Sequence, residues 1–224
     1  MKAVVIIPAQ QASSGVITST VAAAKQHFET IVTTDDSDIY SIVKEYNEDT
    51  PCVMITGVCN SGTERVRRAV QYLERFSFKP NWNIIINWQA NEWECDGQHI
   101  INALREFKSH EADIITLAVP ATPSDITSPD MVKVVTDHQN MAMYFSRSPI
   151  PYNGEQALKH IGIYAFRHDI LAVLGTLDDT AYPSEKLEQV QWLESGLKIK
   201  VCVVPSINAR PTAAENLIKP ADVI

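Results

Sequence analysis

The chain has 224 residues, of which 45% are hydrophobic and 21% charged, a composition that fits one globular domain. Its formal net charge of −8 argues against nucleic-acid binding, which favours a basic surface. No apolar run approaches the roughly 18 residues of a membrane-spanning helix, so we expect no membrane association.

The first half of the chain alternates buried strands with helices. Lys2–Pro8 is a β-branched run stopped by proline, which indicates a first strand rather than a signal peptide. The elements predicted after it are, in order, helix Val16–Phe28, strand Glu29–Thr34, helix Ile39–Tyr46, strand Cys52–Ile55, helix Thr63–Phe76, strand Trp82–Asn87, helix Gln98–Ser109 and strand Asp113–Val119. This β-α alternation indicates a mostly parallel, three-layer α/β sheet.

The rhythm changes after Pro120. Met131–Thr136 and Met141–Phe145 predict a hairpin, and Ile161–Phe166 predicts another strand. Helices Asp169–Gly175 and Ser184–Ser195 and the strand Ile199–Val204 complete the prediction. We expect one domain over residues 1–224, in which the strand-rich segment 132–166 is an inserted subregion or a dimer arm rather than a separate domain.

The four cysteines show no C-x-x-C spacing, and the six histidines show no H-x-H or H-E-x-x-H pattern. This distribution favours reduced thiols over a disulfide framework or a metal site. We therefore expect a cytoplasmic protein.

The stretch Asn83–Glu94 is the most informative part of the chain. Ile84, Ile85 and Ile86 form a short β-branched run, which predicts a buried strand. A polar cluster follows it: Asn87, Gln89, Asn91, Glu92 and Glu94. Because ligands of open α/β sheets bind just past the carboxyl ends of strands, we expect the functional site at this polar cluster.

N-W-Q-A-N-E-W, at Asn87–Trp93, resembles the N-V-Q-G-D-E-P stretch of the CMP-Kdo synthetases (3-deoxy-manno-octulosonate cytidylyltransferases). The resemblance covers nearly the whole chain. Further matching motifs occur in the family's order: V-V-I-I-P-A at Val4–Ala9, S-G-T-E-R at Ser61–Arg65, T-L-A-V-P at Thr116–Pro120, V-K-V-V at Val132–Val135, Y-F-S-R-x-x-I-P at Tyr144–Pro151, H-I-G-I-Y at His160–Tyr164 and L-E-Q at Leu187–Gln189. The resemblance implies a Rossmann-like nucleotidyltransferase fold and a homodimer formed through segment 132–166.

The resemblance also implies two groups of binding residues. The nucleotide side comprises Ser61, Gly62, Thr63, Arg65 and Gln89. The sugar-acid side comprises Arg147, His160, Tyr164, Glu188 and Gln189. Two plainer interpretations stay open, because S-G-T-E-R also suits a helix cap and a lone histidine such as His160 is often a satisfied core residue.

The chain departs from the family where phosphate and metal would be held. The family's nucleotide loop, A-R-x-x-S-T-R-x-P-x-K-P, aligns with A-Q-Q-A-S-S-G-V-I-T-S-T, so the two arginines and the lysine become Gln10, Gly15 and Ser19. A stretch of the family's chain after Val21 has no counterpart. The two aspartates that hold magnesium become Asn91 and Thr212. Mg²⁺ is usually bound through one or two carboxylates plus substrate phosphates, so we expect neither a metal site nor a cofactor.

Gln89 and Glu92 are polar enough to support a displaced metal, although they do not replace two converging carboxylates. Trp88 and Trp93 stand where the family has Val and Pro. We interpret both as core aromatics; the alternative is that Trp93 fills space vacated by the nucleotide.

The family reaction implied by the resemblance joins CTP to 3-deoxy-manno-octulosonate (Kdo), giving CMP-Kdo and pyrophosphate for lipopolysaccharide. Our leading hypothesis is a catalytically impaired cytidylyltransferase that keeps a sugar-acid pocket and binds a small acidic sugar, a nucleotide or a partner. The alternatives are an active but atypical nucleotidyltransferase on an acidic sugar and an enzyme with altered chemistry on a related sugar.

Overall fold

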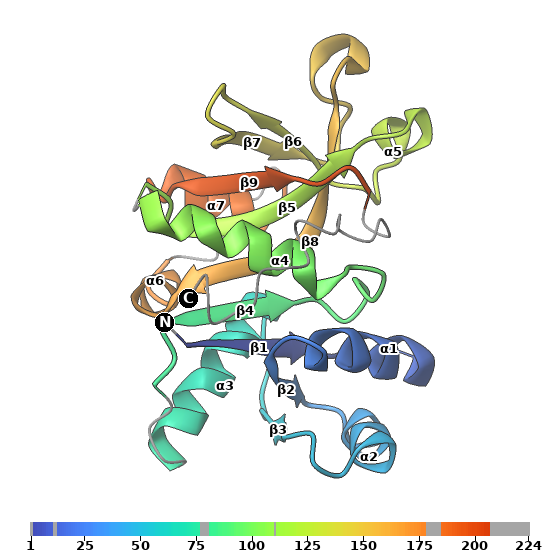
Figure 1. Ribbon diagram of the computed structural model, residues 1–224, viewed down its shortest axis with the longest axis vertical. Helices are drawn as coiled ribbons and strands as arrows, with labels where there is room; N and C mark the ends of the chain where they lie inside the picture. The colour runs from blue at the N-terminus through green and yellow to red at the C-terminus, as the bar shows by residue number, and fades with distance from the viewer. Residues whose placement is uncertain (1, 11–12, 77–80, 110, 178–184, 207–224) are drawn as a thin grey trace.

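The computed structural model describes residues 2–10, 13–76, 81–109, 111–177 and 185–206. Within them the strands form one nine-stranded sheet with helices on both faces, which is the predicted three-layer α/β arrangement (Figure 1). None of the helices in these ranges has the length and apolar character needed to span a bilayer. The fold class predicted from the β-α alternation is therefore confirmed.

The first half of the sheet is parallel, and β1 lies at its centre. Strand order is β3-β2-β1-β4, with Ile6 of β1 opposite Ile31 on one side and Asn87 on the other. The elements are β1 (Ala3–Pro8), α1 (Ser14–Lys25), β2 (Glu29–Thr34), α2 (Ser37–Tyr46), β3 (Cys52–Met54), α3 (Gly62–Phe76) and β4 (Ile84–Trp88). Asp36 caps α2 by accepting from the backbone N–H groups of Asp38 and Ile39.

The second half contains a strand that runs against its neighbours. β8 pairs antiparallel with β4 on one side and with β5 on the other, and β9 then pairs parallel with β5. The elements are α4 (Gly97–Ala103), a 3-10 helix (Leu104–Ser109), β5 (Ile114–Pro120), α5 (Pro123–Thr127), β6 (Lys133–Thr136), β7 (Ala142–Ser146), a short 3-10 turn (Tyr152–Gly154), β8 (Leu158–Arg167), α6 (His168–Leu174), α7 (Glu188–Glu194) and β9 (Ile199–Val203).

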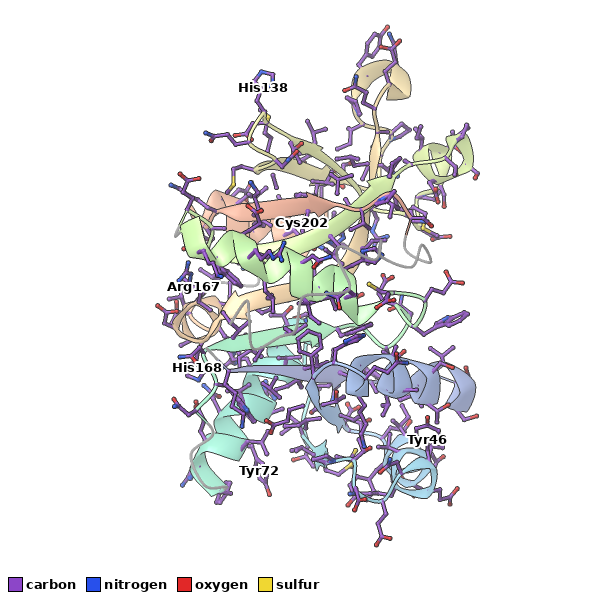
Figure 2. All side chains as sticks on the ribbon, in the orientation of Figure 1. Tyr46, Tyr72, His138, Arg167, His168 and Cys202 are labelled. Carbon is purple, nitrogen blue, oxygen red and sulfur yellow. The ribbon has the colours of Figure 1, made fainter. Side chains whose placement is uncertain are left out.

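Segment 132–166 is divided between two positions in the fold. The predicted hairpin forms as β6 and β7, off the main strand order, and His138 at its tip extends away from the body (Figure 2). β8, in contrast, lies in the middle of the main sheet. The later part of the segment is thus integral to the domain core.

Several element boundaries differ from the predictions. The helix predicted over Gln98–Ser109 is α for one part and 3-10 for the rest. α5 was not predicted; Thr122 caps it in a reciprocal capping box with Asp125, and Pro123 follows at the first turn. α7 begins at Glu188, later than predicted, and Ser184 lies outside the described residues.

Each face of the sheet buries its own apolar cluster. Val5, Ile7, Ile84 and Ile86 point towards α1 and α4, whereas their neighbours Val4, Ile6 and Ile85 point towards α3 and α7. This alternation along β-branched strands buried on both sides explains why they read as continuous apolar runs. The carboxyl ends of β1 and β4, and the start of α3, are therefore held on a rigid base.

Candidate functional site

The S-G-T-E-R motif forms the start of α3 at the edge of the sheet. Ser61 Oγ accepts a hydrogen bond of 3.1 Å from the Glu64 backbone N–H, and Glu64 Oε2 accepts one of 2.7 Å from the Asn60 N–H. The Ser61 hydroxyl thus caps the helix, and the Glu64 carboxylate binds the backbone N–H of the residue before the cap. The helix-cap interpretation of the motif is therefore confirmed, and the cap fixes where the Thr63 and Arg65 side chains lie.

Glu188 joins the predicted sugar side to the predicted nucleotide side. Its carboxylate accepts hydrogen bonds from Ser61 Oγ (2.6 Å) and Thr63 Oγ1 (3.1 Å), so α7 is tied to the start of α3. Asn87 Nδ2, at the end of β4, donates to Thr63 Oγ1 at 3.1 Å. A polar cavity of about 130 Å³ opens beside this chain of bonds. Its lining includes Ser61, Thr63, Glu64, Arg67, Glu188 and Trp192.

Arg65 is a buried cation beneath this network. Its side chain is 2% exposed, and Nη2 lies 2.9 Å from Asp35 Oδ2, just past β2. Among the described residues, Arg65 Nη1 and Asn87 Oδ1 find no hydrogen-bond partner. Buried polar groups are nearly always paired in native proteins, so one donor and one acceptor here suit a polar group from outside the described chain. Sequence reasoning identified Arg65 but missed its partner Asp35, whose place in an acidic run gave no such signal.

Gln89, Asn91 and Glu92 form the turn that follows β4. Glu92 Oε1 accepts from the Gly162 N–H at 3.0 Å, and the Gln89 N–H donates to the Gly162 carbonyl at 3.3 Å. Burial raises the pKa of Glu92 above its ordinary value. Asn91 lies exposed at the tip of this turn.

Gly162 makes this contact possible. The β5–β8 register shifts between Thr116 and Leu117, opposite this part of β8, so the glycine backbone is turned to the β4 loop. A Cβ on Gly162 would lie 2.4 Å from Gln89 Oε1. The H-I-G-I-Y motif contains this glycine, but the sequence gave no indication of which loop it meets.

His160 and Tyr164 lie in an aromatic row on β8. His160 Nε2 is 2.9 Å from Thr116 Oγ1, which also donates to the Ile163 carbonyl at 2.7 Å. Burial lowers the pKa of His160 to about 3, and the ring is neutral at physiological pH. These contacts are those of a buried core histidine with its hydrogen-bonding group paired, which is the plainer of the two interpretations left open by the sequence.

Gln189 and Tyr164 form a buried hydrogen-bonded pair. Gln189 Nε2 donates to the Tyr164 hydroxyl, and both side chains are buried. Burial raises the pKa of Tyr164 well above its ordinary value. Tyr164 also meets the Trp192 ring edge-on. The structure thus brings His160, Tyr164 and Gln189 together, with Glu188 adjacent in sequence on α7.

Arg147 belongs to a different cluster. Its guanidinium Nη1 donates to the carbonyls of Pro129 (3.1 Å) and Asp130 (3.3 Å). Its backbone N–H donates to Glu185 Oε2, and its carbonyl accepts from the buried Lys133 ammonium. The side chain is exposed at the end of β7. These contacts anchor Arg147 beside the hairpin rather than against Tyr164.

The positions of the family's phosphate-binding cations lie on the surface. Gln10 follows β1, and Gly15 and Ser19 are four residues apart on α1, so they share a helix face; all three are exposed. Thr212 lies outside the described residues. Trp88 is buried and donates to the Glu92 carbonyl at 2.9 Å, as expected for a core aromatic. Trp93 is 46% exposed, so interpreting it as a core residue was wrong.

Asn91 is the one described residue at the family's two metal positions, and it lacks the carboxylate through which magnesium is usually held. Asn91 offers a neutral carboxamide, and the neighbouring Glu92 carboxylate is turned to Gly162. Within the described ranges no three His, Cys, Asp or Glu side chains converge as a metal-binding group.

Comparison with known proteins identifies relatives of this chain. The family model described as Cytidylyltransferase matches residues 12–199. A 3-deoxy-manno-octulosonate cytidylyltransferase of Porphyromonas gingivalis is 37% identical over 187 residues, covering 76% of this chain and 70% of the relative. The enzyme of that name from Rickettsia prowazekii is 31% identical over 191 residues, covering 85% and 76%.

Solved structures give the same picture. A CMP:2-keto-3-deoxy-manno-octonic acid synthetase complexed with CTP superposes with a TM-score of 0.79 at 28% identity, covering 97% of this chain and 95% of the other. The 4-diphosphocytidyl-2C-methyl-D-erythritol synthase of Anaerococcus prevotii has a TM-score of 0.60 at 14% identity over 96% and 92% of the chains, a likeness of fold alone.

Proposed function

This chain belongs to the cytidylyltransferase family, among the relatives of the 3-deoxy-manno-octulosonate cytidylyltransferases, and we propose that it is a catalytically impaired member that still binds a small acidic ligand. The ligand is an acidic sugar of the Kdo type or a nucleotide. The observation that carries this proposal is the chemistry of the residues at the phosphate and metal positions.

A triphosphate needs local cations on a protein with a net charge of −8. Gln10, Gly15 and Ser19 provide an amide, no side chain and a hydroxyl on the exposed surface of the β1–α1 region. A hydrogen bond to a charged group contributes about 1.5–3 kcal/mol, so the loss of three lowers affinity or rate by several powers of ten. Asn91, in the turn after β4, has a carboxamide where the family has a carboxylate, so a metal ligand is lost as well as the three cations.

The groups that remain support retained binding. Ser61, Thr63 and Glu188 lie together beside a polar cavity, and the buried Arg65 holds a donor that no described residue uses. Neutral and anionic oxygens of a sugar acid or a nucleotide are suitable acceptors for hydroxyl and guanidinium donors. Binding would require the ligand to compete with Glu188 for the two hydroxyls.

A second candidate function is an active but atypical cytidylyltransferase. The identity of 37% to a 3-deoxy-manno-octulosonate cytidylyltransferase favours it, as does the intact S-G-T-E-R start of α3. In that case the phosphate contacts would come from other cations of this chain.

Pyrophosphate release separates the two candidates. With CTP, Kdo and magnesium, we expect background rates from the wild type, from Asn91→Asp and from Gly15→Arg, for which nothing lies within 4 Å of the added Cβ. Members of a catalytic set are not additive, so restoring one recovers little. Turnover by the unmodified protein in the normal enzyme range of roughly 1–1000 per second would refute the proposal of an impaired enzyme and support an active but atypical cytidylyltransferase.

Ligand binding is tested by thermal unfolding without nucleotide. A ligand that binds only the native state raises the melting temperature by mass action, so millimolar Kdo should give a measurable shift. Because Arg67 lines the polar cavity beside Ser61 and Glu188, Arg67→Ala should reduce the shift, whereas Arg105→Ala, an exposed arginine outside that cavity, should leave it unchanged. No shift in the wild type, or equal shifts in both variants, would contradict a retained sugar pocket.

We also propose that the chain forms a homodimer through the hairpin region. β7 carries Met143 and Tyr144, which are 63% and 41% exposed, on a hairpin that stands off the main sheet. Burying these apolar side chains against a second copy is favourable. Light scattering should give twice the chain mass, and Met143→Lys should give the monomer mass; a monomeric wild type would refute the arrangement.

A further inference from the structure

An open cleft of about 430 Å³ lies between α1 and the loop that joins β4 to α4. We call it the α1 cleft and define it by Ala23, Gln26, Trp93, Glu94, Cys95, Asp96 and Gly97. None of these residues lines the Ser61–Glu188 cavity. Its volume falls within the usual range of small-ligand pockets, roughly 300–1,000 Å³.

The walls of the α1 cleft are fixed at both ends. Thr20 Oγ1 of α1 donates to the buried Ala90 carbonyl at 2.6 Å. At the other end the His27 ring packs against Gly97, where an added Cβ would lie 2.6 Å from the ring, and His27 Nε2 is 3.6 Å from Asp96 Oδ1. The Cys95 N–H also donates to the Glu92 carbonyl at 3.2 Å. The loop is thus pre-organised, which reduces the entropy lost on binding.

Trp93 presents an indole to this cleft. It is 46% exposed, whereas Trp82, Trp88 and Trp192, the other three tryptophans of the chain, are buried. The ring therefore offers an aromatic face to a ligand that enters the cleft. The π face of an indole attracts cations more strongly than that of any other side chain.

The charge around the indole points to the same class of ligand. Glu94 is exposed, the Asp96 side chain is 34% exposed, and no Lys or Arg occurs among the described residues that line the cleft. A guanidinium group suits this combination better than an ammonium, because it is planar, stacks on aromatic rings and pairs with carboxylates in a fork.

We propose that the α1 cleft binds the arginine side chain of a partner protein, stacked on Trp93 and paired with Glu94 and Asp96. The net charge of −8 favours the approach of a basic partner surface. The proposal does not depend on the cytidylyltransferase chemistry, because none of these side chains lines the Ser61–Glu188 cavity.

Tryptophan fluorescence tests the proposal directly, because Trp93 is exposed whereas the other three tryptophans are buried. The probe is N-acetyl-arginine amide, titrated into the full chain. We expect a saturable change in emission at millimolar concentration. The neutral isostere N-acetyl-citrulline amide should bind at least tenfold more weakly, and methylguanidinium, which lacks the peptide groups, should bind more weakly than the arginine probe.

Two variants complete the test. Glu94→Gln keeps the size of an exposed side chain and should weaken the arginine probe several-fold, while Glu45→Gln, an exposed carboxylate on α2, should not. Circular dichroism confirms that each variant is folded. The proposal is overturned if the arginine probe leaves the emission unchanged, if citrulline binds equally well, if methylguanidinium binds as tightly as the arginine probe, or if both variants behave like the wild type.

Discussion

Replacing Gly162 by alanine tests whether the turn carrying Asn91 is locked onto β8. The new Cβ would lie 2.4 Å from Gln89 Oε1 and 3.0 Å from Glu92 Oε1, so at least the Gln89 side chain has to move. Overpacking of this kind costs about 1–3 kcal/mol. Weakening the hydrogen bond between the Gly162 N–H and the Glu92 carboxylate adds to that cost, by up to about 1.5–3 kcal/mol if the bond is lost.

Urea denaturation of Gly162→Ala should therefore give a free energy of unfolding lower by about 2–4 kcal/mol, combining the overpacking and hydrogen-bond costs. For a chain of this length, each kcal/mol lowers the melting temperature by about 2–4 °C. The matched control is Gly15→Ala in α1, where nothing lies within 4 Å of the new Cβ. A helical glycine changed to alanine should raise the stability by up to about 1 kcal/mol. Equal stability of Gly162→Ala and the wild type would mean that Gln89 swings away freely and that the turn is not held by β8.

Two further predictions concern buried ionisable groups. Because the folded-state pKa of His160 is about 3, below its ordinary value of 6.5, the unfolded chain binds the proton more readily, so this residue's contribution to stability is complete above about pH 6.5 and is lost as the pH falls towards 3. The loss is about 1.4 kcal/mol per pH unit in that window, and His160→Phe should remove that part of the slope measured by urea denaturation at several pH values. Asp35→Asn should lower the free energy of unfolding by up to about 3–5 kcal/mol, because it leaves the buried Arg65 charge without its carboxylate. Arg65→Met should cost less, because the Asp35 side chain is more exposed than that of Arg65. Equal losses in the two variants would indicate that the desolvated arginine is not the costly partner.

The strands of the first half could be predicted because their residues are buried on both faces. β2 has the predicted bounds, and β1 and β4 differ by a residue or two. Continuous β-branched runs report burial directly, and the helices between them report one buried face each. Such patterns say little about partners, however. That β8 runs antiparallel between β4 and β5 depends on contacts with residues far away in the chain, which no local periodicity encodes.

The candidate site was predictable where a motif carries its own geometry. S-G-T-E-R contains the spacing of a capping box, so Ser61 and Glu64 are found at the start of a helix as the motif suggests. The partners of buried polar groups were not predictable. Asp35 for Arg65, Thr116 for His160 and Gly162 for Glu92 each come from a distant strand or loop, and their choice depends on sheet register. Trp93 was wrongly predicted to be buried, because hydrophobicity alone favours burial whereas this residue lies in a surface loop.

From the antiparallel placement of β8 we expect a particular order of events in folding. β1 to β4 can pair with one another as the chain emerges, but the join between β4 and β5 stays open until β8, some distance further along, enters between them. The same strand carries the Gly162 backbone that receives Glu92, so the Asn91 turn gains its support only when the two parts of the sheet are joined. We therefore expect the ligand-facing edge to be among the last regions to acquire protection from hydrogen exchange during refolding, and among the first to lose it when β8 is weakened.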